Sequence, residues 1–201
     1  MVKSYGRVTR ARFVGASIAS ARPSVFSERS EGSATKYPWG ERIIMGVGPS
    51  TKETTLHHFR DPLINLIAED PDIDFLGVVI GGIPDRNVDK KFTGERIGAW
   101  LEAMRCDGAI VSEDSWGNSN VDLAAAMEAI GRRDIPQVGM VLIGTQGIVD
   151  QNEYMDTMVD TNHSKEGTET NIVAENCMTM VEARKCVALL KLKMSRKYGH
   201  L

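Results

Sequence analysis

Short apolar runs alternate along the chain with stretches in which apolar residues recur every three or four positions. Four runs rich in Val, Ile or Met predict strands over 42–48, 74–82, 107–113 and 137–144. A weaker run over 155–161 predicts one more, shorter strand. The run over 74–82 is so continuous that we expect it to be buried on both faces, as in a parallel sheet.

Helices are predicted between these strands. Asp61 and Pro62 form a suitable helix start, because a capping side chain precedes a ring that needs no hydrogen-bond donor. Thr93 is the expected cap of the next helix, in which Trp100 belongs to the apolar stripe. Gly131 is expected just past the end of a third helix, where a left-handed residue commonly follows.

A fourth apolar stripe over 180–194 predicts a final helix, with Lys and Arg at its end where cations suit the helix dipole. Strand and helix thus alternate at short spacing. This predicts an α/β fold with an open, mostly parallel sheet and helices on both faces, of the Rossmann or flavodoxin-like kind. Ligands of such sheets bind beyond the carboxyl ends of the strands, which here are 46–58, 80–87, 112–122 and 143–148.

Composition narrows the class of protein. The 201 residues are 42% hydrophobic and 25% charged, with a net charge of −3, so nothing favours nucleic acid or an anionic membrane as partner. No run of 18 apolar residues exists, and we expect no membrane span. Three cysteines without CxxC spacing argue against disulfides and metal sites, and they favour the reducing cytoplasm.

The amino-terminal stretch differs from the rest of the chain. It contains basic residues, Ser and Ala but no acid before Glu28, and a Pro/Ser/Gly-rich segment follows it. Its short apolar core is too weak for a secretion signal. We therefore predict a basic arm and linker over 1–36 that orders only against a partner, and an α/β domain over 37–201.

Polar residues gather where the predicted strand over 107–113 ends. Glu113 and Asp114 are candidates to hold an ammonium group or to transfer protons. Ser112, Asn118 and Asp122 are candidates for substrate binding, although capping of the next helix would explain the asparagine equally well.

A second polar segment, "GPSTKETTLHHFRDP", follows the strand predicted over 42–48. Ser50 is a candidate nucleophile, and His57 or His58 a candidate base. Adjacent histidines without a third ligand do not predict a metal site. Thr54 and Thr55 are further candidates for substrate binding.

Two stretches, "TTLHH" and "GAIVSEDSWGN", identify a resemblance to the carboxyl-terminal half of the proprotein subunits of glycine, sarcosine, betaine and D-proline reductases. In that family the proprotein cuts itself before a cysteine, which becomes a pyruvoyl group that captures the substrate amine. The resemblance puts Ser50 in the place of that cysteine. Serine is the weaker nucleophile, so we expect the chain to stay uncut at Pro49–Ser50 and to carry no cofactor, while a pyruvoyl group from Ser50 is the alternative.

The resemblance implies a subunit of a reductase complex that cleaves a C–N bond in a small amine or amino-acid-like substrate. It implies as partner a subunit that supplies the missing amino-terminal region or carries a reactive selenocysteine or cysteine; a homo-oligomer is also open. Two alternatives stand beside this function. The chain is a non-catalytic paralogue that acts as scaffold or regulator, or it is an unrelated enzyme that uses Ser50 or Glu113 directly.

Overall fold

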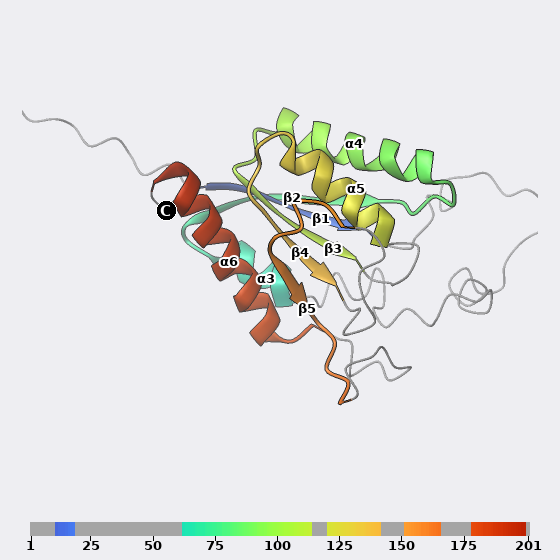
Figure 1. Cartoon of the computed structure of the whole chain (residues 1–201). Helices are drawn as coiled ribbons and strands as arrows, with labels where there is room; N and C mark the ends of the chain where they lie inside the picture. Colours follow the sequence, from blue (N-terminus) through green and yellow to red (C-terminus); the bar gives the residue numbers. More distant parts are fainter. Residues whose placement is uncertain (1–10, 19–61, 114–119, 142–150, 166–177, 200–201) are drawn as a thin grey trace, which may run out of the picture.

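The computed structural model describes residues 11–18, 62–113, 120–141, 151–165 and 178–199, which form five strands and four helices (Figure 1). The strands are β1 (Ala11–Ile18), β2 (Ile73–Gly81), β3 (Gly108–Glu113), β4 (Gln137–Val141) and β5 (Met158–Asp160). The helices are α3 (Pro62–Glu69), α4 (Asn87–Ala103), α5 (Asn120–Gly131) and α6 (Met180–Tyr198). None of these helices combines the length and the apolar character needed to cross a membrane.

The strands form one sheet in the order β2-β1-β3-β4-β5, and every neighbouring pair is parallel. Helices α4 and α5 cover one face, and α3 and α6 cover the other (Figure 1). The prediction of an α/β protein with a parallel sheet and helices on both faces is therefore confirmed. The predicted short strand over 155–161 is also present, as β5.

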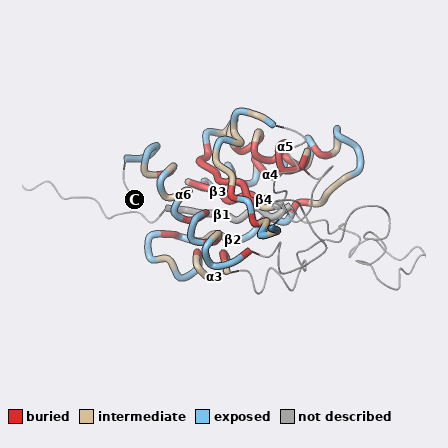
Figure 2. Tube along the Cα trace, turned by 60° about the horizontal axis from the view of Figure 1, so that its bottom comes forward, coloured by how far each residue is buried: buried red, intermediate tan, exposed pale blue. Residues whose placement is uncertain are grey.

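The interior consists of two apolar clusters, one on each side of the sheet (Figure 2). Alternate residues of β3 point to opposite clusters: Ala109 and Val111 face α4 and α5, whereas Ile110 faces α3 and α6. This alternation is the period of two that a strand imposes on its side chains. Both faces of β3 are thus buried, as its continuous apolar sequence predicts.

Strand β1 differs from the sequence prediction of an arm. Residues 11–18 lie inside the sheet, between β2 and β3, with ladders on both sides. Half of the segment ARFVGASI is small residues and Arg12 interrupts it, which hides it from a search for apolar runs. A strand with two neighbours gains its stability largely from their pairing, so its own propensity is a weak guide. The predicted strand over 42–48 lies outside the described residues.

Strand β2 lies at the edge of the described sheet. The prediction that it is buried on both faces is wrong, because part of it is exposed. Gly77 has φ +139° beside a register shift in the ladder to β1, which is the geometry of a β-bulge. Beyond this bulge, Val78 and Ile80 are exposed. Helix α3 contacts the earlier half of the strand, where Ile73 joins its apolar cluster.

Helix α4 begins at Asn87, six residues before the predicted cap Thr93. The hydroxyl of Thr93 instead donates a hydrogen bond to the backbone oxygen of Asp89, 2.9 Å away within the same helix.

Gly131 is the last residue of α5 and not a left-handed residue after it. An added Cβ atom there would lie 2.1 Å from the Tyr154 ring. The glycine therefore lets this ring pack directly against the end of α5.

Helices α4 and α5 approach one another closely. A Cβ atom on Gly94 would lie 2.7 Å from the carbonyl carbon of Ala125, and one on Gly98 would lie 2.9 Å from the carbonyl oxygen of Ala129. The two glycines therefore let the helix backbones touch where they cross. This contact fixes how the first turns of both helices stand at the carboxyl edge of the sheet.

We expect Gly94→Ala to lower the free energy of unfolding by about 1–3 kcal/mol, because the added methyl group forces the two helices apart. Helix propensity alone favours alanine over glycine by about 1 kcal/mol. The matched control compares Lys91→Gly with Lys91→Ala on the exposed face of the same helix, where alanine should be the more stable. Urea denaturation of wild type and the three variants measures both differences; a stabilised Gly94→Ala variant would contradict the close contact.

Helix α6 begins with a capping box. Thr179 accepts a hydrogen bond from the Val181 backbone N–H at 3.2 Å, and its own backbone N–H donates to the Glu182 carboxylate at 2.8 Å. Partial burial acts to raise the pKa of Glu182, but the hydrogen bonds from Thr179 and the nearby His163 outweigh it, so the pKa is lowered.

The lowered pKa of Glu182 predicts how α6 responds to acid. The carboxylate stabilises the folded state above its ordinary pKa of 4.5, and this contribution is lost as the pH falls through the lower folded value. Wild type should therefore be more stable than Glu182→Gln at neutral pH, with the difference shrinking below about pH 4.5. Thermal unfolding across this range measures the difference; a gap that stays constant or widens in acid would argue against the capping role.

Candidate functional site

The carboxyl ends of three adjacent strands lie level with one another. Ile18, the last residue of β1, pairs with Gly81 at the end of β2 and with Glu113 at the end of β3. Because these strands are parallel, the chain leaves the sheet at one edge after each of them. This edge is where open parallel sheets bind their ligands.

The structure describes three of the predicted site residues. Ser112, which is half-buried, and Glu113 are the last two residues of β3, and Asp122 is buried in the first turn of α5. They therefore belong to the same end of the sheet. The other seven candidates lie outside the described residues, and their roles stay predictions: Ser50, Thr54, Thr55, His57, His58, Asp114 and Asn118.

Asp122 forms an ion pair with Lys90, which lies in the first turn of α4. The lysine side chain has no exposed surface, and that of Asp122 is 2% exposed. Water therefore cannot replace either partner, and each buried charge is compensated by the opposite charge of the other. The pair joins the two helices at the edge where Glu113 ends its strand.

Burial raises the pKa of Asp122 from 3.8 to about 6, although the hydrogen bond and the charge of Lys90 act in the opposite direction. The cost of removing the carboxylate from water thus exceeds the attraction of the lysine. One oxygen of the carboxylate, Oδ1, accepts no hydrogen bond from the described residues. Asp122 is consequently a buried acid that holds the start of α5, with its second oxygen still able to accept a donor.

Lys90 was not among the residues selected from the sequence. It precedes Gly94, Ile97 and Leu101 by four, seven and eleven residues, so it lies on the buried stripe of α4. A lysine on such a stripe needs a carboxylate partner from another element. That rule identifies the lysine from sequence, but it does not identify Asp122, which lies 32 positions further along the chain.

Further hydrogen bonds fix α5 against its surroundings. The Gln137 side chain of β4 donates to the backbone oxygen of Met127 at 2.6 Å, and the Asn152 side chain donates to that of Ala124 at 2.9 Å. Both acceptors belong to α5. The helix that follows the candidate loop is thus held on three sides, by α4, by β4 and by the segment before β5.

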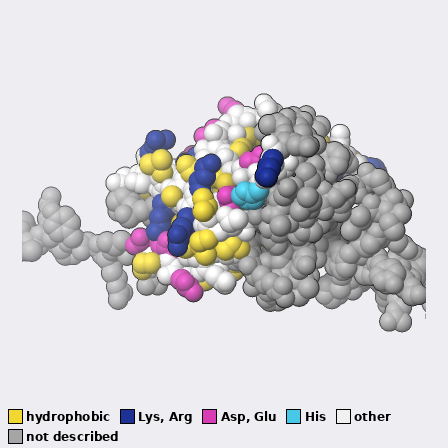
Figure 3. Space-filling view, turned by 90° about the horizontal axis from the view of Figure 1, so that it is seen from below, with side chains coloured by type: hydrophobic (Ala, Val, Ile, Leu, Met, Phe, Trp, Pro, Cys, Tyr) yellow, Lys and Arg dark blue, Asp and Glu magenta, His cyan; other side chains and the backbone are white. Residues whose placement is uncertain are grey.

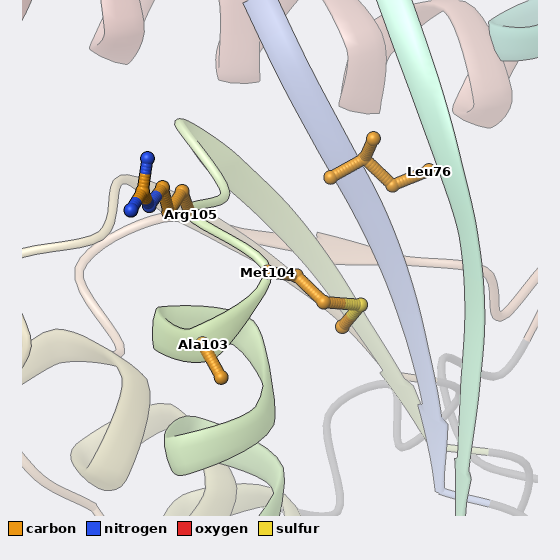
Figure 4. A pocket seen from close by; sticks show the side chains of 4 residues that line it. All are labelled: Leu76, Ala103, Met104 and Arg105. Atoms are coloured by element: carbon orange, nitrogen blue, oxygen red, sulfur yellow. The ribbon is translucent and has the colours of Figure 1, made fainter.

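A shallow pocket of about 510 Å³ lies at the other end of the sheet (Figure 4). Its lining includes Leu76 of β2, Ala103 of α4, and Met104 and Arg105 before β3. The only charged group among these four is the guanidinium of Arg105. The pocket therefore lies away from Glu113 and offers none of the acids that the candidate chemistry needs. Within the ranges described, no three His, Cys, Asp or Glu side chains gather into a metal site.

Fold and edge geometry define an α/β protein with a candidate site at the carboxyl end of its parallel sheet. Residues 43–190 match the family model of glycine/sarcosine/betaine reductase component B subunits. This match spans more than half of the chain, and the chain therefore belongs to that family. The resemblance seen in the sequence is thus confirmed.

Two curated relatives agree with this assignment. The D-proline reductase proprotein PrdA of Acetoanaerobium sticklandii is 37% identical over 159 residues, which cover 79% of this chain and 25% of that protein. The sarcosine reductase complex component B subunit alpha of Peptoclostridium acidaminophilum is 29% identical over 79 residues, or 38% of this chain and 18% of that protein. The chain spans a quarter or less of either relative. No solved structure matches it.

We expect Lys90→Met to destabilise the fold at pH 7 by about 3–5 kcal/mol, because Asp122 is left as a buried charge without its partner. The loss should shrink as the pH falls from 7 to 5, since the unpaired carboxyl escapes its charge by taking up a proton. Chemical denaturation at several pH values measures this.

The double variant Lys90→Met/Asp122→Leu is the matched control for the loss of the lysine. Because two apolar side chains replace two buried charges, it should recover most or all of the stability. A double variant as unstable as Lys90→Met would show that lost shape, and not the uncompensated charge, causes the loss.

Proposed function

We propose that this chain is a subunit of a glycine- or D-proline-reductase-like complex that cleaves a C–N bond reductively in a small amine or amino-acid-like substrate. The observation that carries the proposal is the 37% identity to the D-proline reductase proprotein over 79% of this chain. The sarcosine reductase component supports the same class of substrate, an amine on a short carbon skeleton.

Reductive cleavage breaks the C–N bond with two electrons and two protons: the carbon gains hydrogen and the nitrogen leaves as an amine. A partner subunit with a selenol or thiol supplies the electrons and is oxidised to a selenenylsulfide or disulfide. This chain contributes Glu113 and Asp114, which hold the substrate ammonium group and transfer protons. Ser112, Asn118 and Asp122 shape the pocket around them.

Ser50 separates two versions of this proposal. Serine in the place of the family's cysteine is a weak nucleophile, so we derive no step through a pyruvoyl group. In the first version His57 or His58 and the acids act on substrate held by the complex. In the second, which Ser50 favours, the chain is a non-catalytic paralogue that keeps the fold and the surface for its partners.

We further propose that the sheet is flavodoxin-like and that the protein works in the cytoplasm. Support for the fold comes from the strand order β2-β1-β3-β4-β5, which is the 2-1-3-4-5 order of doubly wound sheets of that kind. In such sheets the ligand lies between the ends of the first and third strands, which here are the ends of β1 and β3. Support for the location comes from the three cysteines without a pairing pattern.

The test uses the chain purified from its own host with every polypeptide bound to it. Glycine, sarcosine, betaine and D-proline are supplied in turn with a dithiol, and mass spectrometry follows the reduced products. We expect one of them to be consumed, and Glu113→Gln to lower the turnover by about a hundredfold. Glu69→Gln, on the exposed end of α3, is the control and should leave turnover unchanged.

Intact mass of the same preparation decides the role of Ser50. A single chain of 22.1 kDa is expected, and fragments with a carbonyl terminus would restore the pyruvoyl alternative. An uncut chain that co-purifies with reductase subunits, yet whose Glu113→Gln variant keeps full turnover, would establish the non-catalytic version. Purification without any partner and without turnover of the four substrates would contradict both versions.

A further inference from the structure

Three large apolar side chains stand exposed in a line on α4. Val88 is 66% exposed, Phe92 is 65% exposed and Trp100 is 48% exposed, although the sequence pattern placed Trp100 on the buried stripe. Arg96 fills the gap in this spacing of four, and its guanidinium lies 5.6 Å from the centre of the Trp100 ring. We call these four residues the α4 ridge, because side chains four apart form the ridges by which helices pack together.

The α4 ridge has no role in the interior. The buried residues of this helix are Lys90, Gly94, Ile97, Gly98 and Leu101, which lie on its opposite side. Helix α4 forms the outer border of its layer (Figure 1). On the opposite face of the molecule, basic and acidic side chains interrupt the apolar ones (Figure 3). Three large exposed apolar side chains around one arginine form the kind of surface that binds another protein.

The charges beside the α4 ridge favour its own copy as that protein. When two α4 ridges lie antiparallel, Val88 meets Trp100 of the copy and Phe92 meets Arg96, because both pairs share residue 94 as midpoint. Each guanidinium then faces an aromatic ring of the other chain, a favourable cation–π contact. A parallel arrangement would instead put Arg96 against Arg96.

One flank of the ridge agrees with this antiparallel register. Lys91, which is exposed, then lies about 3 Å along the helices from Glu95 of the copy, within reach of its carboxylate. Glu95 already binds Arg132 and Arg133 of its own α5 at 3.1 Å, so Lys91 of the copy would join an existing network of charges. Opposite charges therefore meet on one side of the ridge.

We propose that the α4 ridge is a docking surface for a second copy of this chain, which places its own α4 ridge against it in an antiparallel, two-fold arrangement. Such a contact is isologous, so one surface serves both chains and the assembly closes as a dimer. The interface is one helix wide, and association should depend on concentration in the micromolar range. It leaves the carboxyl edge of the sheet free for substrate and for other subunits.

Light scattering on the purified full chain across the micromolar range tests the proposal. The mass should rise with concentration from 22.1 kDa toward twice that value. Phe92→Glu should remain monomeric at concentrations where wild type is a dimer. Val181→Glu, at a 70% exposed site on α6, is the matched control and should dimerise like wild type. A monomer at all concentrations, or a dimer that Phe92→Glu leaves intact, would overturn the proposal.

Crosslinking tests the antiparallel register and does not depend on how Phe92→Glu folds. A mixture of Val88→Cys and Trp100→Cys chains should form a disulfide-linked pair of unlike chains under oxidation. Val88→Cys alone should not, because its two copies stand about 18 Å apart along the helices. Efficient crosslinking of Val88→Cys with itself would overturn the register.

A different polypeptide is the remaining occupant of the α4 ridge. If wild type alone is monomeric but holds a reductase subunit that Phe92→Glu releases, the ridge belongs to that partner and the second copy is excluded. The dimer is independent of catalysis, so its failure would leave the proposed reductase function standing.

Discussion

The ion pair between Lys90 and Asp122 joins the two helices that begin at the candidate edge of the sheet. Neither charge reaches water. If the start of either helix moved away, the charge on the other helix would be left buried and unpaired. The same two helices touch through Gly94 and Gly98, where a single methyl group would collide with the backbone. Charge and close contact therefore act together, and the first turns of α4 and α5 have one stable arrangement.

That arrangement matters because α5 follows directly on the loop that carries the candidate acids. Strand β3 fixes where this loop begins, at Glu113, and Asp122 fixes where it ends. Residues 114–119 lie outside the described residues; before them Glu113 pairs with Ile18, and after them Asp122 binds Lys90. Asp122 is a buried acid with a raised pKa, and through Lys90 it holds the first turn of α5.

Membership of the reductase family and the position of Ser50 point in different directions. The match over residues 43–190 assigns the family, whereas a serine stands where the resemblance implies the cysteine that is processed. Ser50, His57 and His58 lie outside the described residues, and the described sheet and the buried pair are built from other residues. A chain of this kind can therefore keep its structure while its chemistry changes.

The sequence alone determined the α/β class, the existence of four of the five strands and all four described helices, and the family. Apolar periodicity is a local property, so it can be read from neighbouring residues; the strand at 73–81 and the helix at 120–131 are examples. The sequence also selected Glu113 and Asp122 as candidates, because polar residues after a buried strand stand out.

Only the tertiary structure decided which distant residues meet. It put β1 in the middle of the sheet, although residues 11–18 resemble a basic arm, because their pairing comes from β2 and β3. It exposed Trp100, because Ile97 and Leu101 of the apolar stripe of α4 face the apolar cluster shared with α5 and Trp100 does not. It also joined Lys90 to Asp122 across 32 positions of chain. Strand pairing and helix contacts join residues that are far apart in the sequence, and a local pattern of residues does not show which of them meet.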